Sequence, residues 1–419
     1  MSRLGCAAVV VLLATRAHAE PELKPVLSTH GWAIDLTGYV QADAVVYAQA
    51  SADEIDPGTG APLNQERFGI PRASLRVDAR RGPFSGTLEL EAFTTRATLP
   101  RPAQTAGVRL EQALAAWHEG ELVEVVGGLF RIPFGTQTPS SPRDRAFLEL
   151  PTFNRALFPG DIDAGVMVRG ALGLARWSVA AMNGAPVGDT AWKGADPSSS
   201  YDIVARVGAE VPLPRRTRVT GGVSAVTGAT LSPGTPPTKD QLVWVDEDGD
   251  GQVSPSEIQV IAGSPGQPSQ PFDHRALGAD LRVDWCLCAL GTGYAFFEGA
   301  IATNLDRGLV YADPIKRSRD VRELGFAVGV VQHVGETALV GVRFDRYDAD
   351  RDATEIQGGA NVGNQQRFQT VSIMASGMWS GARILGQYDH ATNPFGRDDT
   401  GAIVSRRDDR ITLRAQVGF

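Results

Sequence analysis

The residues best placed to do chemistry lie in one acidic stretch, DEDGDGQVSPSE, at residues 246–257. The acidic and polar residues occupy positions one, three, five, seven, nine and twelve of a twelve-residue calcium loop. Gly251 stands at position six, where such a loop turns sharply. The candidate metal ligands are Asp246, Asp248, Asp250, Gln252 through its backbone carbonyl, Ser254 through a water, and Glu257. This spacing predicts one bound calcium ion.

The residues on either side of this motif limit what the calcium would do. Calcium sensors place the loop between two helices and usually pair two such loops. Here residues 242–244 read Leu-Val-Trp, which is a β-like run, and residues 256–262 could form barely two helical turns. The sequence has no second copy of the motif. We therefore predict a loop ordered by calcium rather than a sensor, and the alternative is a hydrophilic loop with accidental spacing.

Other candidate chemistry is sparse. The six histidines are scattered without a metal-ligand spacing. No nucleophile elbow or phosphate-binding loop stands out, so we predict that the protein is not an enzyme. A hydrolase with a serine and histidine pair remains a minor alternative. Cys286 and Cys288 flank a predicted turn, where they are structural residues or form a local disulfide; their role stays open.

The amino-terminal residues predict export. Arg3 precedes an apolar run from Leu4 to Ala14, and Ala17-His18-Ala19 is a small-x-small cleavage site. This is the pattern of a signal peptide covering residues 1–19. The run is too short to cross a bilayer as a helix. The formal net charge of the chain is −8, and this acidity argues against a nucleic-acid partner.

The carboxyl-terminal residues indicate a membrane barrel. Ile411, Leu413, Ala415, Val417 and Phe419 lie on one face of a strand, and Arg410, Thr412, Arg414 and Gln416 lie on the other. This strict alternation runs to the last residue. A final strand that ends in Phe is typical of bacterial outer-membrane barrels. Phe419 is therefore the candidate assembly signal, read by the barrel-assembly machinery.

The same alternation recurs along the whole mature chain. The predicted strands are 32–49, 66–80, 83–96, 106–118, 121–130, 162–171, 174–183, 201–211, 216–229, 273–286, 288–304, 320–333, 336–348, 366–379, 382–391 and 402–419. An even number near sixteen is what a single-chain bacterial barrel requires. The predicted fold class is therefore all-β, a transmembrane antiparallel β-barrel of about sixteen strands formed by residues 20–419.

The connections between these strands alternate in length. The tight links are 81–82, 120, 172–173, 212–215, 287, 335 and 380–381, and the long ones are 50–65, 97–105, 131–161, 184–200, 230–272, 305–319, 349–365 and 392–401. Outer-membrane barrels have short turns on the periplasmic side and long loops outside. The calcium loop would then lie within the extracellular loop 230–272.

One region resembles a known family. Gly128, Phe130, Pro133, Phe134 and Gly135 follow the G-x-F-x-x-P-F-G pattern of the phosphate-selective porin O and P family. Two further matches, a D-x-G strand start and an NG strand end, are Asp163 with Gly165 and Asn183 with Gly184. The resemblance is clearest over residues 66–184. It implies a homotrimeric porin of sixteen strands whose loop 131–161 folds inward and constricts the lumen.

Arginines are the candidate pore-lining residues, because a guanidinium group suits phosphate and carboxylate oxygens. They are Arg72, Arg76, Arg109, Arg131, Arg143, Arg145, Arg155, Arg169, Arg206 and Arg282. Inward acids such as Glu89, Glu91 and Asp280 are nearly as frequent, so a mixed-charge lumen with little selectivity is the alternative. The chain has only four lysines. Phosphate-selective members of the family use a lysine cluster, so a general small-anion or nonspecific porin is the safer prediction.

The sequence thus predicts a porin in the outer membrane of a Gram-negative bacterium. Small solutes, with anions such as phosphate among them, would diffuse through an arginine-lined constriction, and membrane lipid would surround the barrel. One alternative is a non-conducting surface barrel whose calcium-bound loop serves adhesion or envelope attachment. Another is a soluble secreted calcium-binding β-protein. Conductance in a planar bilayer and solubility without detergent distinguish them.

Overall fold

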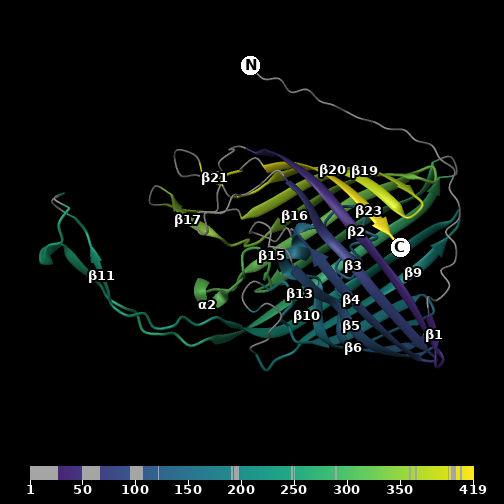
Figure 1. Cartoon of the computed structure of the whole chain (residues 1–419), viewed down its shortest axis with the longest axis horizontal. Coiled ribbons are helices and arrows are strands. Elements are labelled where there is room, and N and C mark those ends of the chain that lie inside the picture. The colour runs from purple at the N-terminus through teal and green to yellow at the C-terminus, as the bar shows by residue number, and fades with distance from the viewer. Residues whose placement is uncertain are drawn as a thin grey trace, which may run out of the picture.

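The computed structural model is a closed antiparallel β-barrel (Figure 1). It describes residues 27–49, 67–94, 107–120, 122–189, 192, 198–246, 249, 251–287, 290–357, 360–363, 366–394, 396–397, 403–405 and 408–419. The predicted signal peptide, residues 1–19, and Cys288 lie outside this part of the chain, and Cys286 lies near the end of a strand. In the described ranges, no helix is long and apolar enough to cross a membrane.

Sixteen strands in the described ranges form the wall, and each is antiparallel to its neighbours. They are β2 (Trp32–Gln49), β3 (Arg67–Arg81), β4 (Phe84–Phe93), β5 (Gly107–Glu119), β6 (Val123–Arg131), β7 (Ile162–Leu172), β8 (Ala175–Met182), β9 (Asp202–Leu213), β10 (Thr217–Ser232), β13 (Gln270–Leu287), β14 (Gly291–Thr303), β15 (Arg322–Val334), β16 (Ala338–Asp348), β19 (Arg367–Trp379), β20 (Ala382–Thr392) and β23 (Asp408–Gly418). Pairing of β2 with β23 closes the ring, and β1 (Leu27–Thr29) extends β2 in a hairpin. The predicted fold class and strand number are confirmed.

The period-two pattern determines which way each side chain faces. On β13, Leu277 and Leu281 are exposed on the outer surface, while Asp280 and His274 are buried inside. The final strand behaves in the same way, with Leu413 outside and Arg414 inside. Apolar side chains therefore cover the outer surface of the barrel, where only lipid suits them. This places the protein in the outer membrane of a Gram-negative bacterium, as predicted.

Tight turns lie at one end of the barrel and long loops at the other (Figure 1). The turn residues Gly82, Gly120, Gly173 and Gly335 all have positive φ, which glycine adopts at little cost. The predicted last strand begins later than expected. Residues 403–404 form β22 (Ile403–Val404), which pairs with β21 (Gly396–Arg397), so the wall strand starts only at Asp408.

The loop between β10 and β13 carries a separate two-stranded arm. Its strands are β11 (Gln241–Trp244) and β12 (Ile258–Ile261), joined through the short helix η1 (Pro255–Glu257). The arm stands away from the mouth of the barrel (Figure 1). A smaller hairpin, β17 (Thr354–Gln357) with β18 (Ala360–Gly363), rises from another loop on the same side.

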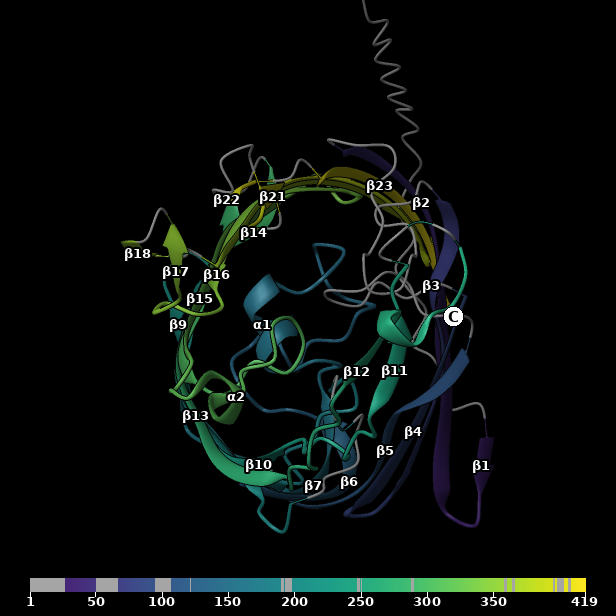
Figure 2. The ribbon, with the colours of Figure 1, turned by 90° about the vertical axis from the view of Figure 1, so that its left-hand side faces the viewer.

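Two loops fold into the ring and fill part of the lumen (Figure 2). The first follows β6 and contains α1 (Thr152–Leu157); the second follows β14 and contains α2 (Pro314–Arg317). The first loop brings Phe134 and Phe153 against the inner wall. A Cβ atom on Gly278 would lie 2.7 Å from the Phe134 ring, and one on Gly325 would lie 2.1 Å from the Phe153 Cβ. Glycine on the wall strands therefore makes room for the aromatic side chains of the loop.

Candidate functional site

A buried carboxylate holds the start of the constriction loop against the wall. Glu298 on β14 is 1% exposed. Its carboxylate accepts hydrogen bonds from the Thr136 N–H at 2.7 Å, the Gln137 N–H at 2.9 Å, the Thr136 hydroxyl at 2.8 Å and the Asn154 side-chain amide at 2.8 Å. Four hydrogen bonds from three loop residues converge on this one carboxyl group, so it forms the anchor of the loop. Glu298 therefore fixes both ends of the loop segment 136–154.

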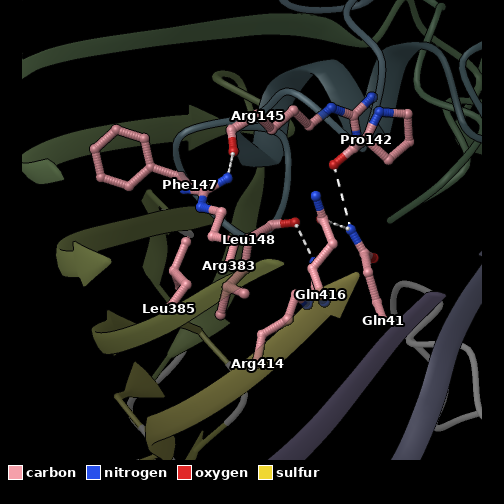
Figure 3. Close-up of a pocket in the computed structure, with 9 residues that line it drawn as sticks. All are labelled: Gln41, Pro142, Arg145, Phe147, Leu148, Arg383, Leu385, Arg414 and Gln416. Carbon is pink, nitrogen blue, oxygen red and sulfur yellow. Dashed lines mark hydrogen bonds between the residues drawn. The ribbon is translucent and has the colours of Figure 1, made fainter. Parts of the chain in front are cut away.

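Another part of the wall, formed by β20 and β23, holds the loop in the reverse sense, with wall side chains donating to loop carbonyl groups. Arg383 on β20 donates to the carbonyl oxygens of Arg145 at 2.7 Å and Ala146 at 2.9 Å (Figure 3). Gln416 donates to the Arg143 carbonyl at 3.2 Å. The hollow left between loop and wall here measures about 10 Å³, which is at most the room for one water. The loop is thus sealed onto this side of the barrel.

The second inward loop, residues 304–321, packs on the first. The backbone N–H groups of Arg307 and Gly308 both donate to the Ala156 carbonyl at 2.9 Å. Fully buried Asp306 accepts hydrogen bonds from Leu309 N–H at 2.9 Å and from the Tyr347 hydroxyl at 2.7 Å. Burial raises the pKa of the Asp306 carboxyl, although these hydrogen bonds oppose the rise. The sequence predicted one constricting loop, and the structure has two that support each other.

Glu149 of the constriction loop lies among arginines. Arg72 on β3 donates to both carboxylate oxygens of Glu149 at 3.1 Å, and an Arg414 nitrogen lies 3.6 Å from one of them. Burial alone would raise the pKa of the Glu149 carboxyl. The charges of Arg72, Arg414 and Arg155 outweigh burial and hold that pKa well below the ordinary value of 4.5. Glu149 is therefore ionised across the physiological range.

Eight of the ten predicted pore arginines have carboxylate partners. The pairs are Arg72 with Glu149, Arg76 with Asp78, Arg109 with Glu111, Arg131 and Arg145 with Asp161, Arg169 with Glu124, Arg206 with Asp280, and Arg282 with Asp284. The Arg206 pair is bidentate, at 3.1 and 2.6 Å. The Arg131 contact is long, at 4.0 Å. Much of the arginine charge in the lumen is thus balanced locally by neighbouring acids.

The remaining two predicted arginines are on the constriction loop. Neither Arg143 nor Arg155 forms an ion pair within 4.0 Å with any acid that the structure describes. Two wall arginines that the prediction omitted bind mainly to neutral groups. Arg383 donates to backbone carbonyls, and Arg343 donates to the Glu149 carbonyl at 2.7 Å, with Asp345 farther away at 3.6 Å. Arg143, Arg155 and Arg383 therefore leave positive charge at the junction of loop and wall.

A lumenal cavity of about 840 Å³ opens between the constriction loop and the tight turns. The loop side is formed by Arg131, Pro133 and Thr136, and the wall side includes Arg76 and Arg206. The cavity is wide enough for a small hydrated solute, since ligand pockets commonly measure ~300 to 1,000 Å³. We call it the vestibule.

The calcium motif forms the tip of the projecting arm. The Asp246 carboxylate accepts hydrogen bonds from Gly249 N–H at 2.7 Å and Gly251 N–H at 3.0 Å. Glu257 is buried, and its carboxylate accepts from Ser254 N–H at 3.0 Å and Trp244 Nε1–H at 3.1 Å. Asp248 and Asp250 lie outside the described residues. Among the residues that are described, no group of three or more metal-binding side chains is assembled.

Several residues that build the site were not predicted as site residues, namely Glu149, Glu298, Arg343, Arg383 and Arg414. Alternation alone identifies most of them as inward. Arg343, for example, lies between the outward-facing Val342 and Phe344 on β16. Alternation does not predict the path of the constriction loop. That path determines which of the inward side chains contact the loop.

No family model matches the chain, and no curated sequence matches it either. Solved structures share the fold. The outer-membrane channel DcaP of Acinetobacter baumannii has a TM-score of 0.57 at 12% identity, covering 95% of this chain and 100% of that one. OprB of Pseudomonas putida has a TM-score of 0.54 at 12% identity, and the match covers 93% of this chain and 94% of that one. The anion-selective porin of Comamonas acidovorans has a TM-score of 0.51 at 10% identity, and the match covers 93% of this chain and 100% of that one. At these identities the comparisons establish a porin-type barrel and no more.

Proposed function

We propose that the protein is a porin that lets small solutes, with a preference for anions, diffuse across the outer membrane. The observation that carries this proposal is the vestibule, about 840 Å³ of polar lumen that ends at a loop anchored across the barrel. Sixteen strands enclose a bore wide enough for water. A fixed loop inside it then sets the size and charge of what passes.

The anion preference rests on where arginine charge is left unbalanced. Arg143 and Arg155 have no close acidic partner among the described residues, and Arg383 donates to carbonyl groups. The charge of a guanidinium group that binds neutral oxygens is not compensated nearby, whereas a carboxylate partner offsets the field of a paired one. The excess therefore lies at the constriction, where it acts most strongly on a passing ion.

A planar-bilayer recording tests this function. Purified protein should insert with stable conductance steps, and a potassium chloride gradient should give a reversal potential on the side expected for chloride permeation. A barrel that seals the bilayer would instead support the alternative of a non-conducting surface protein.

We also propose a kinship with one family of porins. Gly128 to Gly135 and the Asp163 strand start support a kinship with the phosphate-selective porin O and P family. Because the chain has only four lysines, we propose small anions in general as solutes rather than phosphate alone. Replacing chloride by phosphate in the same recording should lower the current in proportion to ion mobility and show no phosphate-specific binding.

We also propose that three copies associate and that the barrel-assembly machinery reads the last strand. An outer hollow of about 490 Å³ supports the first point. It is floored by small residues, including Ala42, Ala44 and Ala415, and Phe68 stands beside it. Small residues let membrane-embedded surfaces approach closely. Replacing Ala42 by Trp should shift the protein from trimer to monomer on a semi-native gel, and deleting Phe419 should reduce assembly.

Finally, we propose one calcium ion at the tip of the arm, held by Asp246, Asp248, Asp250, Gln252, Ser254 and Glu257. The ligand spacing supports this site, and so does the turn of the Asp246 carboxylate into the loop. Two-stranded hairpins are only marginally stable alone. Bound calcium would neutralise the crowded carboxylates and order the arm.

A further inference from the structure

The Glu149 carboxylate occupies a position suited to a carboxylate solute. Arg72 meets it through two parallel hydrogen bonds of 3.1 Å, one to each oxygen. This fork geometry is the one by which arginine recognises a carboxylate group in general. Arg414 approaches the same carboxylate at 3.6 Å, and the charge of Arg155 acts on it as well. Two guanidinium groups, those of Arg72 and Arg414, therefore lie within 4.0 Å of one oxyanion that belongs to the protein itself.

This carboxylate is not the main anchor of the loop at that point. The Glu149 carbonyl accepts a hydrogen bond from Arg343 at 2.7 Å, and the Leu148 N–H donates to Gln387 at 3.0 Å. The side chains of Leu148 and Leu150 are both buried at 3% exposure. Backbone and apolar contacts thus hold the loop here without the carboxylate. The side chain still reaches the arginines and is 20% exposed.

We propose that Glu149 is a tethered occupant of a carboxylate-binding site formed by Arg72, with Arg414 beside it. This inference rests on the proposed channel function and deepens it. A solute carboxylate must compete with the carboxylate already in place, whose effective concentration is high because it is attached. The solute carboxylate therefore binds weakly, and the solute passes through the channel instead of blocking it. Conduction needs this compromise between entry and exit.

The arrangement predicts a gain of binding when the tethered group is neutralised. In Glu149→Gln the Arg72 fork loses its charged partner. The remaining acid near Arg72 is Glu91, at 3.6 Å. Arg414 keeps its own bidentate partner, Asp43, at 2.7 and 2.8 Å. A small carboxylate such as acetate then finds the Arg72 fork without the carboxylate that bridges its two nitrogens.

The test is block of chloride current by acetate in a planar bilayer. We expect acetate to leave the parent channel nearly unblocked at millimolar concentrations. In Glu149→Gln, the half-blocking concentration should fall at least about tenfold, as expected when an attached competitor is removed. Asp35→Asn is the control. It also removes one lumenal negative charge, but Asp35 pairs with Arg80 near the tight turns, away from the Arg72 fork. It should show no acetate block.

The double variant Arg72→Gln/Glu149→Gln checks that the block depends on the arginine fork. It should return the half-blocking concentration to the parent range. Equal acetate sensitivity in the parent and Glu149→Gln would overturn the proposal while leaving the channel function in place. Absence of conductance steps in the parent would instead remove the channel function. If Glu149→Gln does not fold, Glu149→Asp should show partial block, and no block in that variant also overturns the proposal.

Discussion

Phe419, the last residue, closes the barrel on Gly38. The two residues exchange backbone hydrogen bonds, at 2.9 Å from the Gly38 N–H and 3.0 Å from the Phe419 N–H. A Cβ atom on Gly38 would lie 2.5 Å from the Phe419 ring and 2.7 Å from the Ser74 carbonyl. The terminal aromatic ring thus lies over a strand position that only glycine leaves free.

Replacing Gly38 by Val should therefore weaken closure of the barrel. The added side chain meets both a ring and backbone, and overpacking of this kind costs about 1 to 3 kcal/mol. The measurement is the temperature at which the folded band disappears in heat-modifiable gel mobility. Gly386→Val is the matched control, since nothing lies within 4 Å of a Cβ at that position. Equal midpoints for the two variants would contradict the closing role of this contact.

Glu298→Gln should loosen the constriction loop. The amide keeps one acceptor oxygen, but it brings an N–H₂ group toward the donors from Thr136, Gln137 and Asn154. Leaving a buried donor without its acceptor should cost about 1 to 3 kcal/mol. We expect larger, noisier conductance and faster tryptic cleavage within the loop. Unchanged conductance and cleavage would show that Glu298 does not hold the loop.

The sequence predicted the wall of the barrel well because period-two alternation is a local property. Residues 273–286 alternate so regularly that β13 was located to within a few residues. The last strand began late because the charged residues near 408 form the start of the wall strand, while residues 403–404 pair elsewhere. Alternation also identified inward arginines and inward acids, but it did not show whether they pair with each other. The structure shows such pairs, for example at Arg76 and Arg206.

The interior could be predicted only in part because it depends on contacts between distant residues. The family resemblance implied an inward loop at 131–161. Nothing in residues 305–319 indicated a second one, because it is held by the carbonyl of Ala156, far away in sequence. Glu298 was likewise an ordinary inward position until the loop backbone was placed against it. The spacing of acidic residues identified the calcium motif, but spacing alone does not show whether the ion binds.

The pair of Glu149 and Arg72 should contribute stability with a defined pH dependence. The folded-state pKa of Glu149 lies well below the ordinary 4.5. A depressed carboxyl pKa contributes stability that is fully present above the unfolded pKa and is lost as pH falls through the folded one. The difference in thermal midpoint between the parent and Glu149→Gln should therefore stay constant from pH 7 to 5 and shrink only below 4.5. Shrinkage that begins above pH 5 would mean that the carboxyl is not stabilised by the arginines.

Calcium should protect the projecting arm from protease and leave the barrel unchanged. With millimolar calcium, cleavage between residues 233 and 269 should slow severalfold, because the bound ion orders the loop. Chelation should reverse this effect. The double variant Asp246→Asn/Glu257→Gln removes the first and last ligands and should abolish the protection. If calcium gives the same protection in that variant, the ion acts elsewhere.

The unbalanced arginines should determine ion preference. Arg155→Gln removes a positive charge that no acid pairs closely with among the described residues, and it should shift the reversal potential toward cation permeation. The control Arg206→Gln/Asp280→Asn removes a bidentate pair whose charges already cancel. It should leave the reversal potential unchanged, although the vestibule wall has been altered. Equal shifts in the two variants would show that preference does not arise at the constriction.

The most direct test of the whole account is the current through the purified parent protein in a planar bilayer under a potassium chloride gradient. An open lumen with excess arginine charge at its constriction predicts discrete, stable conductance steps. It also predicts a reversal potential displaced toward that of chloride. A bilayer that stays sealed after the folded barrel has inserted, or a reversal potential displaced toward that of potassium, would contradict it.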